Sequence, residues 1–239
     1  MTTPRDLLIV AFDVTSGHPV DPGDLSLALA GAELIDLLGA EMLVLDGERI
    51  VPSSAGHLAD RQLDEAASLL VRQMPYESVD DWLWRRGRGL SAAYMAALAE
   101  LAMESPEGTA EPGGPEGTGG SEGAGGTIGT GAAGVPEGAT RHRRRWLPFR
   151  HRRSELAADS PARRHAADRL ASGEPVLAAL AAAAGVHDAP VPADDSPSFD
   201  NEAIVTVLAA VNGAVTELEA VRQRRTIEAA AFDNIWRGQ

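Results

Sequence analysis

The sequence contains no cysteine and no lysine, and it is poor in aromatic residues. Without cysteine there is no disulfide framework, no thiolate metal ligand and no thiol nucleophile. Aromatic residues make up 4% of the chain, whereas hydrophobic residues as a whole make up 44%. The core must therefore be built mainly from alanine, leucine, valine and isoleucine, which suits packed helices better than a sandwich of strands.

The sequence also lacks a long apolar run. No run approaches the roughly 18 residues that a membrane-spanning helix needs. The first residues, Met1 to Arg5, lead directly into a predicted helix without the apolar region of a signal peptide. We therefore expect a soluble, cytoplasmic protein.

Positive charge is concentrated in one segment. The formal net charge is −14, but residues 141–153, called the arginine stretch below, contain seven arginines, two histidines and no acid. Subtracting the +7 of this stretch leaves −21 for the rest of the chain. An acidic body does not attract polyanions, so the stretch is the main candidate for binding an anionic partner.

The spacing of apolar residues predicts a mainly α-helical domain around a central helical bundle. The helix over 22–38 is apolar nearly all round, which places it in the middle of the core. Asp46 and Gly47 lie between two short apolar runs, 42–45 and 49–51, and predict a small β-hairpin. The remaining helices are expected over 4–12, 60–73, 78–86, 91–103, 160–172, 175–184 and from 201 onward.

The composition changes abruptly at residue 104. Residues 104–140 hold thirteen of the 25 glycines, six glutamates and no basic residue. Such a segment buries too little apolar surface to offset the entropy lost on ordering, so we expect a disordered insert. We therefore expect one compact helical domain in two parts, 1–103 and 141–239, the second opening with the arginine stretch.

No pattern of polar residues predicts a catalytic centre. None of the six histidines forms a metal-type pair with a carboxylate at helical spacing. Asp80 and Asp81 most simply begin a helix, and Ser53 and Ser54 lack the context of a nucleophile elbow. The glycines of 104–140 lack the Lys-Ser/Thr of a phosphate loop. We predict a protein that is not an enzyme, with no catalytic residue, no cofactor and no metal site.

Five short motifs resemble, in the same order, those of the Golgi phosphoprotein three (GPP34) family, in a bacterial, actinobacterial-type form. The resemblance implies a compact helical domain with a projecting β-hairpin. It also implies a non-enzymatic peripheral membrane protein that recognises phosphatidylinositol 4-phosphate and holds membrane enzymes by their cytosolic tails. The motifs are LLIVAFD at 7–13 followed by TSG at 15–17, LAGAELIDL at 29–37, the segment that starts with residues 60–65 and contains LDEA at 63–66, Trp82, and the segment 154–164.

The resemblance also indicates where the family binds its lipid. The pocket tryptophan of the family falls near Asp21, the arginine of its central motif at Ala30, and its two later arginines at Arg88 and near Ser91. Three of the four ligands therefore differ here. The family uses its projecting hairpin for self-association and for membrane contact. Only residues 145–149 match this hairpin. A homo-oligomer and a membrane contact of this kind are therefore expected here from the resemblance alone.

We expect arginine side chains to bind anionic phospholipid headgroups by charge. Guanidinium groups suit bidentate contact with phosphate, and aromatic rings suit the level of the headgroups. Near an anionic leaflet each such charge contributes on the order of 1 kcal/mol. The predicted lipid-binding or anion-binding residues are Arg85, Arg86, Arg88, Arg141, Arg143, Arg144, Arg145, Trp146, Arg150, Arg152 and Arg153.

Two other interpretations of the arginine stretch stay open. The stretch can neutralise the acidic insert beside it. The protein would then be a scaffold for protein interactions. It can also bind RNA, which is contacted by arginine and aromatic side chains, although the acidic remainder disfavours extended contact with nucleic acid. The interpretation that we favour is a cytoplasmic protein, peripheral to the inner face of the membrane.

Overall fold

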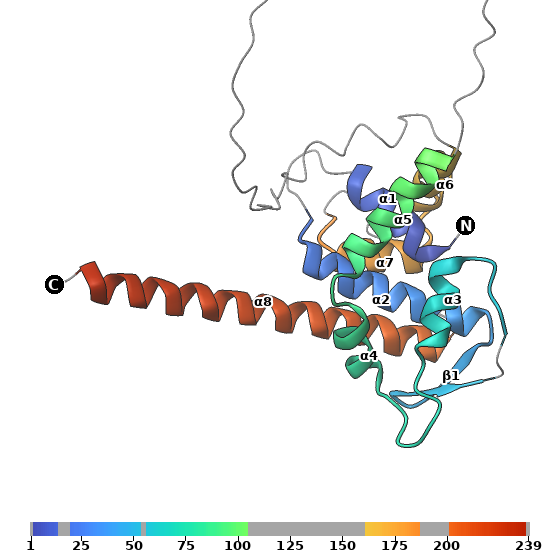
Figure 1. Cartoon of the computed structure of the whole chain (residues 1–239), viewed down its shortest axis with the longest axis horizontal. Coiled ribbons are helices and arrows are strands. Elements are labelled where there is room, and N and C mark those ends of the chain that lie inside the picture. Colours follow the sequence, from blue (N-terminus) through green and yellow to red (C-terminus); the bar gives the residue numbers. More distant parts are fainter. Residues whose placement is uncertain (1, 14–19, 54–55, 105–160, 187–200, 238–239) are drawn as a thin grey trace, which may run out of the picture.

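The computed structural model describes residues 2–13, 20–53, 56–104, 161–186 and 201–237 (Figure 1). These residues form a mainly helical fold with one small β-hairpin, which confirms the predicted fold class. The predicted insert and the whole arginine stretch lie outside the described residues, except Glu104. The elements are α1 (Thr3–Asp13), α2 (Pro22–Gly39), β1 (Leu43–Asp46), β2 (Arg49–Pro52), α3 (Arg61–Ser68), α4 (Val79–Arg86), α5 (Leu90–Glu104), α6 (Pro161–Ala171), α7 (Pro175–Ala183) and α8 (Glu202–Arg237).

Helix α2 lies at the centre of the fold, as its apolar composition predicts. It begins at Asp21, whose carboxylate accepts a hydrogen bond from the N–H of Gly23 at 2.7 Å, and Pro22 occupies its first turn. Helices α1, α5, α7 and α8 pack around it (Figure 1). Since α7 and α8 follow the insert in the sequence, the two ends of the chain share one core.

The hairpin forms where Asp46-Gly47 predicts it. Strands β1 and β2 pair antiparallel, with Val44 opposite Val51, and Gly47 adopts the positive φ of 58° that the turn requires. Leu43 and Ile50 turn inward and are buried. The chain before α4 continues this sheet, because the N–H of Ile50 donates to the carbonyl of Glu77 at 2.9 Å.

Helix α3 is shorter than the predicted helix over 60–73. It ends at Ser68, and the N–H of Leu69 bonds to the carbonyls of Glu65 and Ala66 in a tight final turn. The following residues leave the helix to run towards β2, and Pro75 lacks the N–H that a continuing helix would need. The apolar spacing did not reveal this end, because Leu70 is buried although it lies outside the helix.

From the sequence we predict no segment long and apolar enough to span a membrane, and helix α8 shows that this prediction is wrong. Residues Glu202–Phe232 meet that description by length and composition. Polar residues such as Asn212 and Glu217 interrupt the apolar run without making the helix polar overall. The buried side chains Val207 and Val211 lie on the face of α8 that packs in the core, but only 22% of the apolar window of this helix is buried, so packing accounts for only part of its apolar character.

Candidate functional site

Three of the predicted anion-binding arginines form a small basic patch at the C-terminal end of α4. Arg85 and Arg86 occupy the last turn of this helix, and Arg88 follows in the connection to α5. Cations are stabilised at this end of a helix by its dipole. The three side chains nevertheless have very different surroundings, and these decide what each can bind.

Arg86 is held in a buried ion pair with Glu33 of α2. Its Nε and Nη2 atoms donate to Oε2 and Oε1 of Glu33 at 2.8 and 2.9 Å, and its Nη1 donates to Glu65 at 3.1 Å. The hydroxyl of Tyr94 donates to the same Glu33 carboxylate at 3.0 Å. The Glu33 side chain is fully buried and that of Arg86 is 9% exposed. The cluster of Arg86, Glu33, Glu65 and Tyr94 therefore joins four helices, α2, α3, α4 and α5.

The ionisation of this cluster follows from its burial. Burial raises the pKa of Glu33, and the hydrogen bonds from Arg86 and Tyr94 offset that rise only in part. Burial alone would lower the pKa of Arg86, but its bonds to Glu33 and Glu65 raise it above the ordinary value. Burial and the neighbouring Glu33 both raise the pKa of Tyr94, so its hydroxyl stays protonated as a donor. The ion pair with Arg86 thus opposes the protonation of Glu33 that burial favours.

Arg85 is exposed but also paired. Its Nε and Nη2 atoms donate to the two carboxylate oxygens of Glu77 at 2.6 and 2.7 Å, and Nη2 also donates to the carbonyl of Leu69 at 3.2 Å. The guanidinium lies 5.0 Å from the centroid of the Trp82 ring, within cation–π range. Its bond to Glu77 raises the pKa of Arg85. Arg85 thus fixes the chain between α3 and α4.

Arg88 is the member of this patch whose charge is available to a ligand. It is exposed, and within the described part of the chain it makes no hydrogen bond or ion pair. The structure therefore separates the three arginines: Arg85 and Arg86 stabilise the fold, and Arg88 faces solvent. Sequence spacing alone could not distinguish them, because their acidic partners lie up to 53 residues away.

The other positions at which the family places its lipid ligands do not form a cationic site. Ala30 is fully buried, and its carbonyl accepts a hydrogen bond from the Trp82 indole at 3.3 Å. Ser91 is buried, and its hydroxyl lies 2.9 Å from that of Ser26 and donates to the carbonyl of Pro22 at 3.1 Å. These groups satisfy one another inside the fold. Neither Ala30 nor Ser91 offers a group to an anion.

The remaining family position, Asp21, is occupied by an ion pair with α8. Arg222 contacts Asp21 and donates to both carboxylate oxygens of Asp24, at 2.9 and 3.0 Å. Burial raises the pKa of Asp24, and the bonds from Arg222 counter this. The two carboxylates at the start of α2 thus receive their counter-charge from a residue about 200 positions later. No local pattern in the sequence indicates this contact.

Two fully buried carboxylates of the described residues are paired with arginines. Besides Glu33, the fully buried Asp6 of α1 pairs with Arg169 of α6, which also contacts Glu174. Burial alone would lower the pKa of Arg169, and its bonds to Asp6 and Glu174 raise it. Among the described residues, no three histidine or carboxylate side chains are grouped so that they could hold a metal ion. Each of these buried acids faces an arginine.

Comparison with known proteins places the first part of the chain. The family of Golgi phosphoprotein 3 (GPP34) matches residues 4–103, the segment from α1 to the end of α5. No curated protein and no solved structure matches the chain. The match covers α2, the hairpin and the Glu33–Arg86 pair.

Proposed function

Residues 4–103 belong to the Golgi phosphoprotein 3 (GPP34) family, and from this premise we propose that the protein is a non-enzymatic, peripheral protein of an anionic membrane surface. It binds phospholipid headgroups by charge, through the arginine stretch and Arg88. Its place is the cytoplasmic, inner face of the membrane, where it holds the cytosolic tails of membrane proteins.

The observation that carries this proposal is that arginines of the body form ion pairs with acids, whereas the arginine stretch contains no acid. Of the 14 arginines outside the stretch (21 minus 7), five form ion pairs with acids among the described residues. The body is also acidic, so it repels an anionic surface. The seven arginines of residues 141–153 carry no acid among them. They carry the most concentrated positive charge of the chain, and Arg88 is one of several exposed arginines of the body that form no ion pair among the described residues. The paired arginines are Arg85, Arg86, Arg163, Arg169 and Arg222.

The residues found where the family binds its lipid favour binding by charge over stereospecific recognition of one headgroup. A pocket for phosphatidylinositol 4-phosphate needs several cationic donors that converge on its phosphates. Here Ala30 and Ser91 are buried and satisfied, and Asp21 and Asp24 place negative charge at the start of α2. We therefore expect general anionic lipids to be bound about as well as phosphoinositides of equal charge.

Vesicle cosedimentation tests this proposal. Vesicles of phosphatidylcholine are supplemented with phosphatidylserine, phosphatidylinositol, cardiolipin or phosphatidylinositol 4-phosphate, matched for total negative charge. Binding should follow charge density and fall steeply with salt, because exposed charges are screened within about 8 Å at physiological ionic strength. Binding that survives high salt and requires phosphatidylinositol 4-phosphate contradicts the proposal. Tight binding of single-stranded RNA without vesicle binding favours the nucleic-acid function instead.

A further inference from the structure

Helix α6 is attached to the body with little apolar contact. It lies at the edge of the helical body and packs chiefly on α1 (Figure 1). Of its 11 residues only Ala166 and Leu170 are buried, whereas α7 buries four of its 9 residues. Elements with few buried apolar contacts open most readily in a folded protein. The attachment of α6 therefore depends on its polar contacts.

The polar contacts of α6 are ion pairs with acids of neighbouring elements. Arg163 pairs with Asp13 at the end of α1. Arg169 pairs with the fully buried Asp6, and its Nε atom also donates to Oε2 of Glu174 at 2.7 Å. The side chains of Arg163 and Arg169 are 31% and 23% exposed. Both guanidinium groups are thus within reach of water and of competing anions.

The position of α6 in the chain connects it to the arginine stretch. Pro161, its first residue, is eight residues after Arg153, the last arginine of the stretch. Eight residues span at most about 28 Å, so the stretch stays close to α6. On its other side α6 is followed by Gly173, whose positive φ of 73° is readily available to glycine. A rotation at this glycine would move α6 without moving α7.

We propose, on the basis of the proposed function, that α6 leaves α1 on an anionic membrane and that its three arginines, Arg163, Arg164 and Arg169, then join the arginine stretch at the headgroups. The helix has three arginines against one acid, Asp168, which is a net charge of +2. Two net positive charges near an anionic surface favour the released form by on the order of 30-fold. The membrane thus shifts an equilibrium between docked and released α6.

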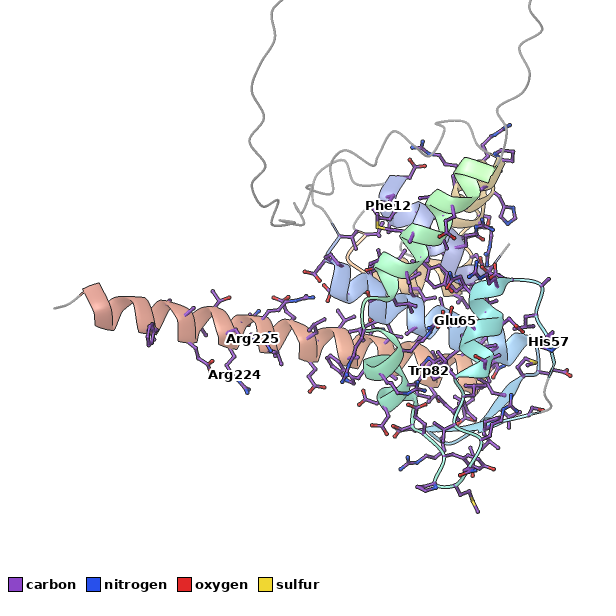
Figure 2. All side chains as sticks on the ribbon, viewed as in Figure 1. Phe12, His57, Glu65, Trp82, Arg224 and Arg225 are labelled. Atoms are coloured by element: carbon purple, nitrogen blue, oxygen red, sulfur yellow. The ribbon has the colours of Figure 1, made fainter. Side chains whose placement is uncertain are left out.

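The release of α6 would be a local change. Arg169 and His165 of α6 both lie against the carboxylate of Asp6, the latter at 3.8 Å, so water returns to this acid when α6 leaves. A buried charge is therefore not left without a partner or water. Figure 2 shows Phe12, the neighbour of Asp13 in α1, well away from Trp82 of α4. The contacts of α4 with the central helix therefore stay in place.

Distances between pairs of spin labels test the release. The full chain has no cysteine, so two introduced cysteines are the only labelling sites. Ala92→Cys on α5 and Ala167→Cys on α6, both at exposed positions, should give one narrow distance in double electron–electron resonance. This distance should persist with phosphatidylcholine vesicles, and phosphatidylserine vesicles should add a second, broad distribution. The matched control combines Ala92→Cys with Ala209→Cys on α8, also exposed, and its distance should not change.

Substitution of one acid tests the role of the ion pairs. Asp13→Asn removes the partner of Arg163 and should add the broad distribution already in solution. It should also raise the affinity for phosphatidylserine vesicles by up to about fivefold, because an ion pair of this exposure no longer holds α6. Asp46→Asn is the control with the same change in charge. It lies in the hairpin turn, where Asn-Gly is as suitable as Asp-Gly, and should leave α6 docked.

The possible failures are distinguishable. A chain that binds phosphatidylserine vesicles and keeps the narrow distance between positions 92 and 167 would overturn the release and leave the proposed function standing. Absence of binding to these vesicles would overturn both. Equal effects of Asp13→Asn and Asp46→Asn would show that the ion pair does not hold α6. The distance between positions 92 and 209 reports whether each variant is folded.

Discussion

Gly31 of α2 lies directly against Val211 of α8. A Cβ atom added at Gly31 would lie 2.4 Å from Cγ2 of Val211, closer than any real contact allows. Glycine inside a helix costs roughly 0.5–1 kcal/mol relative to alanine, so its presence here is explained by the close approach of the two helices. This contact joins the central helix α2 to the C-terminal helix α8.

Substitution of Gly31 by alanine should therefore destabilise the protein by about 1–3 kcal/mol, the usual cost of overpacking a core. The midpoint of urea unfolding measures the effect. Gly39→Ala is the matched control: an added Cβ there meets nothing within 4 Å, so stability should be unchanged or slightly higher. A second change, Val211→Ala, should recover part of the loss from Gly31→Ala, and additivity of the two losses would contradict the contact.

The pair of Glu33 and Arg86 gives a second prediction for stability. Glu33→Gln should lower the free energy of unfolding by about 3–5 kcal/mol, because it leaves the buried Arg86 with only the partly exposed Glu65 as counter-charge. A double variant that combines Glu33→Leu with Arg86→Met should lose less stability than the two single changes together. If Glu33→Gln proves nearly neutral in chemical denaturation, the pair does not hold the four helices together.

The Asp36 carboxylate should make stability depend on pH. Burial raises its pKa above the ordinary 3.8, although hydrogen bonds from Thr3, including a 2.8 Å bond from the backbone N–H, oppose the rise. The folded state therefore holds this proton more tightly than the unfolded state. Binding of this proton therefore stabilises the folded state. This stabilisation is fully present below the pKa of Asp36 in the unfolded state and is lost as the pH rises through its pKa in the folded state.

Asp36→Asn removes this titration while keeping an acceptor for Thr3. The free energy of unfolding of the variant, measured relative to the natural protein, should be higher at pH 7 than at pH 4. Thermal or urea unfolding at the two pH values gives the comparison. A relative stability that is the same at both, or higher at pH 4, would contradict the assignment.

The sequence predicts the helices better than the contacts between them. The apolar residues of α2 and the Asp46-Gly47 turn indicate their elements through local rules, so both were predicted correctly. The end of α3 at Ser68 was missed because the chain leaves the helix to pair with β2, which is a tertiary contact.

The same limit applies to the candidate site. Arg86 and Arg88 look alike in sequence, but one is buried against Glu33 and the other is exposed. The pairing of Arg222 with Asp24 joins residues 198 positions apart, and no local pattern predicts it. A glutamate in the apolar helix 22–38 was the one available signal, because a buried acid needs a cation. Its partner became identifiable only in the fold.

The central claim is that the arginine stretch, and not the body, binds an anionic membrane. Its most direct test compares two variants that each lose three positive charges. One replaces arginines of the stretch with glutamine, and the other replaces exposed arginines of the body. The first set is Arg143, Arg144 and Arg145; the second is Arg61, Arg72 and Arg224.

Cosedimentation with vesicles containing phosphatidylserine, at physiological salt, gives the apparent affinity of each variant. At about 1 kcal/mol per arginine near the surface, the stretch variant should lose on the order of 100-fold in affinity, and the body variant should remain within a few-fold of the natural protein. Equal losses in the two variants, or undiminished binding of the stretch variant, would contradict the account.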